Sequence, residues 1–127
     1  MQFNNQSAIY LQIAGYMYDQ ILSGAWANGE RIPSIRDMAV QLEVNPNTVT
    51  RTYTLLQEEG TLENRRGIGY FTSSDAQQRV LETKRVAFMH KELPALFSTM
   101  QQLGITESDL VKQLRTYQEE QTSHEKK

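Results

Sequence analysis

The sequence predicts a mainly α-helical chain with one small β-hairpin. Three observations support this. Amphipathic segments with marked starts and stops fill the first sixty or so positions, two short β-type runs flank a glycine-containing turn after them, and further apolar residues at helical spacing follow a polar run at 72–75. We therefore expect one domain at residues 1–74, a helical segment at 75–118 and a polar tail at 119–127, whose composition is that of a disordered segment.

The composition excludes several classes of protein. The chain has 127 residues, no cysteine, two histidines far apart and a formal net charge of -2. No apolar run is long enough for a membrane span, and residues 1–7 lack the charged start and apolar stretch of a signal peptide. We expect a cytoplasmic protein without membrane contact and without a cofactor. We assign no catalytic and no metal-binding residues, because no nucleophile, base and stabiliser occur at a recognisable spacing.

The first helix is expected at residues 9–23. Its apolar edge carries Tyr10, Ile13, Met17 and Ile21. Gly24 stands where a left-handed residue ends a helix.

A second helix is expected to begin after Ser34, which can cap it, with Asp37 as a weaker partner in a capping box. Its apolar edge consists of Ile35, Met38, Ala39 and Leu42. A tight corner at residues 43–44 follows.

The third helix is predicted from Pro46 to Glu59, because Asn45 is a favoured N-cap, proline suits the first helical position and Gly60 can end the helix. Its inward positions are Val49, Tyr53 and Leu56. Its outward positions are polar: Asn47, Thr50, Arg51 and Thr54. Two helices joined by a tight corner, the second with such an outer face, are typical of a helix-turn-helix that contacts the major groove of DNA.

A hairpin is expected next, with strands at residues 61–64 and 70–72. The turn between them contains Arg65, Arg66 and two glycines, which permit the positive φ angles of a tight turn. Two adjacent arginines at a hairpin tip have no apolar role, so we interpret the hairpin as a wing that contacts phosphates or the minor groove. Residues 1–74 contain five arginines and no lysine, and arginine provides the planar donor fork that suits these acceptors.

The motifs RIPSIRDMA (31–39), VNPNTV (44–49), EGTL (59–62) and RRGIGYF (65–71), with IYLQI at 9–13, closely resemble the winged helix-turn-helix of GntR-family bacterial transcription regulators. The resemblance covers roughly residues 8–72. Two positions depart from it: Thr61 replaces a larger apolar residue, and Glu43 stands where the corner commonly has glycine.

The resemblance implies DNA contacts at matching positions. It places an arginine contact at Arg36, polar contacts at Asn47, Thr48 and Thr50, and a wing tip at Arg66 and Gly67 that enters the minor groove. With their neighbours, the expected DNA-binding residues are Arg36, Asn45, Asn47, Thr48, Thr50, Arg51, Arg65, Arg66 and Gly67. The Asn-Pro-Asn-Thr corner looks like the YtrA and MocR subfamilies. The MocR-like aminotransferase domain does not fit the residues that follow the wing, whereas a YtrA-like helical dimerisation region does.

The C-terminal part carries a heptad-like apolar stripe, interrupted by Pro94, which should either kink the helix or begin a new segment. A further helix should begin after Gly104, capped by Thr106 and Asp109, with Leu110, Leu114 and Tyr117 on one side. The stripe consists of Val86, Met89, Leu93, Leu96, Met100 and Leu103. We expect it to pair with a second copy of the chain, since two short helices cannot enclose a core alone.

Two functions are compatible with these features. The first is a sequence-specific, dimeric transcriptional repressor that binds a palindromic operator in double-stranded DNA. The alternative is a winged-helix module that binds protein or RNA, favoured by the net acidity and by the absence of lysine from the first part. A small-molecule effector, if the protein binds one, is expected between the DNA-binding part and the appended helices.

Overall fold

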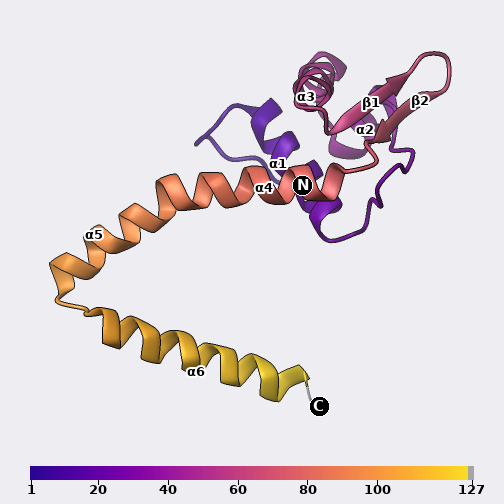
Figure 1. The fold of residues 1–127 in the computed structure, drawn as a ribbon. Coiled ribbons are helices and arrows are strands. Elements are labelled where there is room, and N and C mark those ends of the chain that lie inside the picture. Colours follow the sequence, from indigo (N-terminus) through magenta and orange to yellow (C-terminus); the bar gives the residue numbers. More distant parts are fainter. Residues whose placement is uncertain (126–127) are drawn as a thin grey trace. The chain divides into compact units, whose positions relative to one another are not determined.

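The computed structural model describes residues 1–125 (Figure 1). It divides into two compact units, Met1–Lys84 and Arg85–Lys127. In the described part, no helix is both long enough and apolar enough to cross a bilayer.

Helix α1 (Ile9–Leu22) starts after Ala8, which provides no side-chain cap, and ends at Ser23. Gly24 follows with a φ of 84°, as expected for a residue that stops a helix. The buried side of α1 carries Ile13, Ala14, Met17 and Ile21. Three of the four predicted residues are thus buried, whereas Tyr10 is only half-buried and Ala14 was not predicted.

Helix α2 (Ile35–Leu42) is capped by Ser34 as predicted, because the Ser34 hydroxyl accepts a hydrogen bond from the Asp37 backbone N–H at 3.0 Å. The expected return bond from the Ser34 N–H to the Asp37 carboxylate does not form within residues 1–125. The corner after it departs from ordinary backbone geometry. Glu43 has a φ of 56° and lies in the left-handed region. A side chain there costs roughly 1 kcal/mol or more relative to glycine, so the corner forms with this glutamate at some cost in strain.

Helix α3 (Pro46–Glu58) begins at the predicted proline, and Glu59 is its C-cap. The side-chain oxygen of Asn45 accepts a hydrogen bond from the Asn47 N–H at 2.8 Å. The three predicted inward residues are fully buried, and Thr52 is buried beside them.

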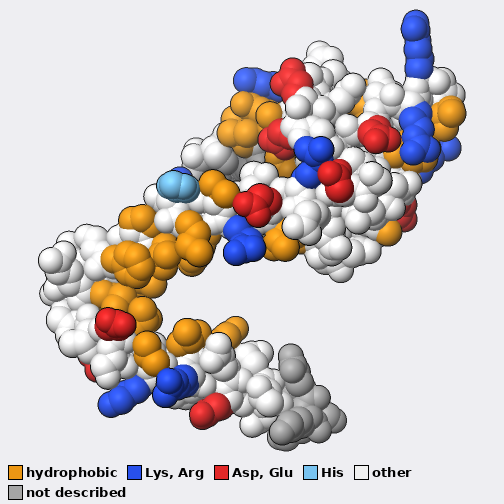
Figure 2. Space-filling model, viewed as in Figure 1, with side chains coloured by type: hydrophobic (Ala, Val, Ile, Leu, Met, Phe, Trp, Pro, Cys, Tyr) orange, Lys and Arg blue, Asp and Glu red, His pale blue; other side chains and the backbone are white. Residues whose placement is uncertain are grey.

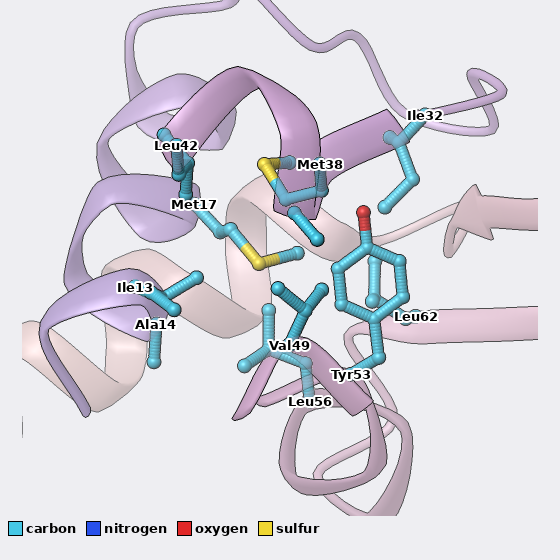
Figure 3. Close-up of a cluster of buried hydrophobic side chains, with 11 residues drawn as sticks. Ile13, Ala14, Met17, Ile32, Met38, Leu42, Val49, Tyr53, Leu56 and Leu62 are labelled. Carbon is cyan, nitrogen blue, oxygen red and sulfur yellow. The ribbon is translucent and has the colours of Figure 1, made fainter. Parts of the chain in front are cut away.

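The core of the first unit lies between these three helices (Figure 3). Tyr53 is central to it. Its hydroxyl donates to the Pro33 carbonyl at 2.6 Å, and its ring meets Tyr70 edge-on with centroids 4.9 Å apart. Burial raises the pKa of the Tyr53 phenol above its usual range, so the hydroxyl remains protonated, and a donor, into the alkaline range.

The hairpin consists of β1 (Leu62–Arg65) and β2 (Gly69–Thr72), paired antiparallel with Arg65 opposite Gly69. The segment before α2 extends this pairing, because the Ile32 N–H donates to the Tyr70 carbonyl at 2.9 Å. The buried Thr72 hydroxyl also donates to the Ala27 carbonyl at 2.6 Å. The wing is therefore attached to the loop between α1 and α2.

Helix α4 (Ala76–Ala87) begins inside the first unit. Ala76 and Val80 are buried against Ile21 of α1, and Lys84 Nζ lies 2.8 Å from Asp19 Oδ1. The unit therefore ends later than the sequence suggested at residue 74, because the polar run after the wing leads directly into a packed helix.

The second unit consists of helical segments: the end of α4, the π-helix η1 (Phe88–Glu92), α5 (Leu93–Leu103) and α6 (Glu107–Glu125). The π-helix directly precedes Pro94, which takes one of the first two positions of α5. A wider turn here accommodates a proline that cannot donate to the helix, so the helix is distorted rather than broken.

Gly104 ends α5 in the left-handed conformation. Thr106 and Asp109 form the expected reciprocal capping box. The Thr106 N–H donates to Asp109 Oδ2 at 3.0 Å, and the Asp109 N–H donates to the Thr106 hydroxyl at 3.2 Å. The segment expected to be a disordered tail is helical as far as Glu125. The last two residues of that tail, Lys126 and Lys127, lie outside the described residues.

We expect a fragment of residues 1–84 to be more stable than a fragment of 1–74 by about 1 to 3 kcal/mol, because only the longer fragment buries Ala76 and Val80. Urea unfolding followed by circular dichroism measures the difference. Val80→Asp in the longer fragment is the control and should remove most of the gain. Equal stability of the two fragments would place the end of the unit back at the wing.

Candidate nucleic-acid interface

The outer face of α3 is polar and exposed, opposite the buried edge that holds the helix in the core. Each of its four predicted outward residues is exposed, namely Asn47, Thr50, Arg51 and Thr54. Thr48, between the two faces, is half-buried. The packing of the core thus fixes which side of α3 is available to another molecule.

The hydrogen bonds inside the protein determine which of these polar groups remain free. The Asn45 side-chain oxygen accepts the cap hydrogen bond, and its NH2 group remains available as a donor. The Thr50 hydroxyl donates to the Pro46 carbonyl at 3.0 Å and can then only accept. The Asn47 side chain makes no hydrogen bond within residues 1–125, so it retains both donor and acceptor capacity.

Arg51 is placed by an aromatic ring. Its guanidinium carbon lies 3.8 Å from the centroid of the Tyr10 ring, a cation–π contact between α3 and the first turn of α1. Arg36, in the first turn of α2, is exposed. None of the ion pairs found among the described residues involves either arginine.

The two arginines of the hairpin differ in their surroundings. Arg65 lies over the Phe71 ring at 4.0 Å, with Glu63 3.6 Å from its guanidinium. Arg66 is exposed, and no ion pair within the described range involves it. Gly67 follows with a φ of 79°. Basic side chains are visible at this end of the first unit in Figure 2.

Arg31 also belongs to the wing, although no role was predicted for it. It forms an isolated bridge with Phe71, and a Cβ atom at Gly69 would lie only 3.1 Å from its Nε. The guanidinium therefore lies against the glycine at the start of β2. Gly69 has a φ of 144°, which disfavours any side chain there. The sequence carries no local signal for a contact between these two distant positions.

All nine predicted DNA-binding residues lie in the first unit, on α2, the corner, α3 and the hairpin. Besides the contact of Arg51 with Tyr10, two hydrogen bonds connect α3 and its C-cap Glu59 to α1. The Thr52 hydroxyl donates to the Tyr10 carbonyl at 2.9 Å, and the Tyr18 hydroxyl donates to Glu59 Oε2 at 2.6 Å. Such contacts hold the exposed face of α3 in one orientation relative to the rest of the unit.

The predicted dimerisation residues lie in the second unit, on the end of α4, η1 and α5. Four of them are exposed, whereas Leu93 and Met100 are half-buried. Phe88 and Phe97 were missed by the heptad-like pattern and are also exposed. Figure 2 shows hydrophobic side chains along these helices.

Comparison with known proteins supports a DNA-binding assignment. The family model for bacterial regulatory proteins of the gntR family matches residues 9–71, from α1 through the wing. The chain is 32% identical over 118 residues to YhcF of Bacillus subtilis (strain 168), an uncharacterized HTH-type transcriptional regulator. The match covers 93% of this chain and 96% of the YhcF chain. The HTH-type transcriptional repressor YtrA of the same strain is 36% identical over 80 residues, covering 63% of this chain and 62% of its own.

A solved structure has the same architecture. A transcriptional regulator of the GntR family from Bacteroides thetaiotaomicron superposes with a TM-score of 0.79 at 37% identity. The superposition covers 90% of this chain and 99% of the Bacteroides chain. The match thus includes the helices after the wing. The chain belongs to the GntR family of bacterial regulatory proteins, is similar to its YtrA-like members, and is a DNA-binding transcription regulator rather than an enzyme.

Proposed function

We propose that this chain is a dimeric repressor that acts in the bacterial cytoplasm on a palindromic operator. Helix α3 contacts base edges in the major groove, and the hairpin contacts the flanking backbone or minor groove. The observation that carries the proposal is the exposed polar face of α3, which the buried edge of the same helix fixes in place. The similarity to the repressor YtrA supports the direction of the regulation.

Asn47 is the residue best suited to contact a base. It lies at the start of α3, where a recognition helix approaches the groove, and its amide makes no hydrogen bond within residues 1–125. A free amide can bond in bidentate fashion to adenine. Thr50, whose hydroxyl can only accept while bonded to Pro46, is suited to an amino group on a base edge.

The arginines are suited to hold the duplex. Arg36 and Arg66 are exposed and have no acidic partner among the described ion pairs, so each can meet a phosphate without breaking a salt bridge. Gly67, with its positive φ, allows the tight turn at the tip of the hairpin, next to Arg66. The remaining residues of the proposed interface are Asn45, Thr48, Arg51 and Arg65.

A second copy of the chain is the partner best suited to the second unit. From residue 85 to residue 124 no side chain is buried, although large apolar side chains occur throughout this range. Apolar surface on this scale is unfavourable in water. The heptad-like spacing suits a helix of the same kind, and pairing would provide the two DNA-binding units that a palindrome requires.

We expect Asn47→Ala to lower the affinity for the operator by about 1 to 3 kcal/mol and to leave the affinity for random duplex nearly unchanged. The operator is obtained by selecting duplexes from a random-sequence library with the full-length protein, and affinities are measured by fluorescence anisotropy. If both duplexes are weakened equally, Asn47 does not contact a base. If the protein selects RNA or a protein ligand instead of duplex DNA, the alternative function holds.

Arg36→Ala and Arg66→Ala should each weaken binding to both the operator and random duplex. The slope of log affinity against log salt should become shallower by about one per lost phosphate contact, or about two per symmetric dimer. Lys112→Ala on α6 is the control, because it removes one positive charge outside the proposed interface. An unchanged slope for Arg66→Ala would exclude the hairpin as a phosphate contact.

Replacing Leu96 by Asp should cost several kcal/mol of association, because pairing would bury an unpaired carboxylate. Light scattering and sedimentation measure the fraction of dimer. Ser98→Asp on the same helix introduces the same charge two positions away from the apolar stripe and should leave the dimer intact. A full dimer for the Leu96 variant would place the interface elsewhere.

A further inference from the structure

Arg51 on α3 and Tyr10 on α1 form a cation–π contact at the surface of the first unit. Arg51 is exposed on α3, and its guanidinium carbon lies 3.8 Å from the Tyr10 ring centroid. In the described part of the chain, the ion pairs and side-chain hydrogen bonds do not include this guanidinium. Within residues 1–125, the Tyr10 ring is therefore the partner of the Arg51 guanidinium. Tyr10 belongs to α1, outside the two helices of the helix-turn-helix.

The backbone of Tyr10 is held in place by the residue that follows Arg51. The buried Thr52 donates its hydroxyl hydrogen to the Tyr10 carbonyl at 2.9 Å. Two consecutive residues of α3 thus contact the same residue of α1, one through its ring and one through its backbone. The Tyr10 side chain is half-buried, so its orientation is restricted by the protein around it.

We propose that Tyr10 is a positioning residue for DNA recognition, and that its ring holds the Arg51 guanidinium in the orientation in which it contacts DNA. This inference rests on the proposed function, which places Arg51 at the interface. An unrestrained arginine on a surface samples many rotamers, and ordering it on binding costs conformational entropy. A ring already beneath the guanidinium removes part of that cost.

The geometry of the contact leaves the arginine free to bind. A guanidinium stacked on a ring uses its flat face, whereas its five N–H donors lie in its plane and point away at the edge. A phosphate, or the O6 and N7 atoms of guanine, can accept from that edge in bidentate fashion. The aromatic contact and the DNA contact therefore do not compete for the same surface.

The test uses the full-length protein and a duplex that it selects from a random-sequence library. We expect Tyr10→Phe to bind like the unmodified protein, because it retains the ring and the Tyr10 hydroxyl makes no hydrogen bond within residues 1–125. Tyr10→Leu should weaken binding about five- to thirty-fold for a dimer that carries the change in both copies. With Arg51→Ala already present, Tyr10→Leu should have no further effect.

The double mutant separates positioning from a general structural role. If Tyr10→Leu weakens binding by the same factor with and without Arg51, the ring supports only the fold, and the inference is wrong. It is also wrong if Arg51→Ala binds normally, or if Tyr10→Leu binds more tightly, since the ring would then hold the guanidinium away from DNA. A protein that selects no duplex at all would instead contradict the proposed function and, with it, this inference.

Nuclear magnetic resonance of the unmodified protein provides a readout that needs no destabilising variant. The side-chain protons of Arg51 should be shifted upfield by the Tyr10 ring in the free protein and in Tyr10→Phe. Ordinary shifts in both would overturn the inference. Base preference then identifies the contact: loss of preference at one base pair in Tyr10→Leu indicates a guanine, and uniform weakening with a shallower salt slope indicates a phosphate.

Discussion

The buried edge of α3 is the constraint on which the first unit depends. Val49, Tyr53 and Leu56 are fully buried, and Tyr53 also joins α3 to two other segments through its hydroxyl on Pro33 and its ring on Tyr70. A helix whose inward side is fixed in this way cannot rotate about its axis. Since inward and outward positions alternate with the helical period, the same contacts determine which side chains are presented to DNA.

Local chemistry explains why the sequence predicted the elements of the first unit so closely. Ser34 and Asn45 act through neighbours two or three residues away, and Gly60 ends α3 through its own backbone, so their effects are visible in the sequence. The end of the unit was not predictable in the same way. Thr72 is polar, as in a linker, but it is buried, and its hydroxyl donates to the carbonyl of Ala27, which is distant in the sequence.

The same distinction applies to the DNA-binding face. Sequence patterns placed the outward polar residues of α3, because helical spacing requires no knowledge of the rest of the fold. They could not show that Thr50 already donates to Pro46. Nor could they show that Arg51 lies on Tyr10 or that Arg31 lies against Gly69, since these contacts join segments far apart in the chain. The sequence thus predicts which groups are present, and the fold determines which of them are free.

The second unit lacks the kind of constraint that organises the first. Its helices have well-defined ends, with Gly104 closing α5 and a capping box opening α6, but between residues 85 and 124 no side chain is buried. Capping fixes where a short helix begins and ends, whereas most helix stability in proteins comes from tertiary packing. If the second unit pairs with another copy, as proposed, its folding and its association become one event. The stability of α5 and α6 then depends on protein concentration, while the core around α3 remains a property of the single chain.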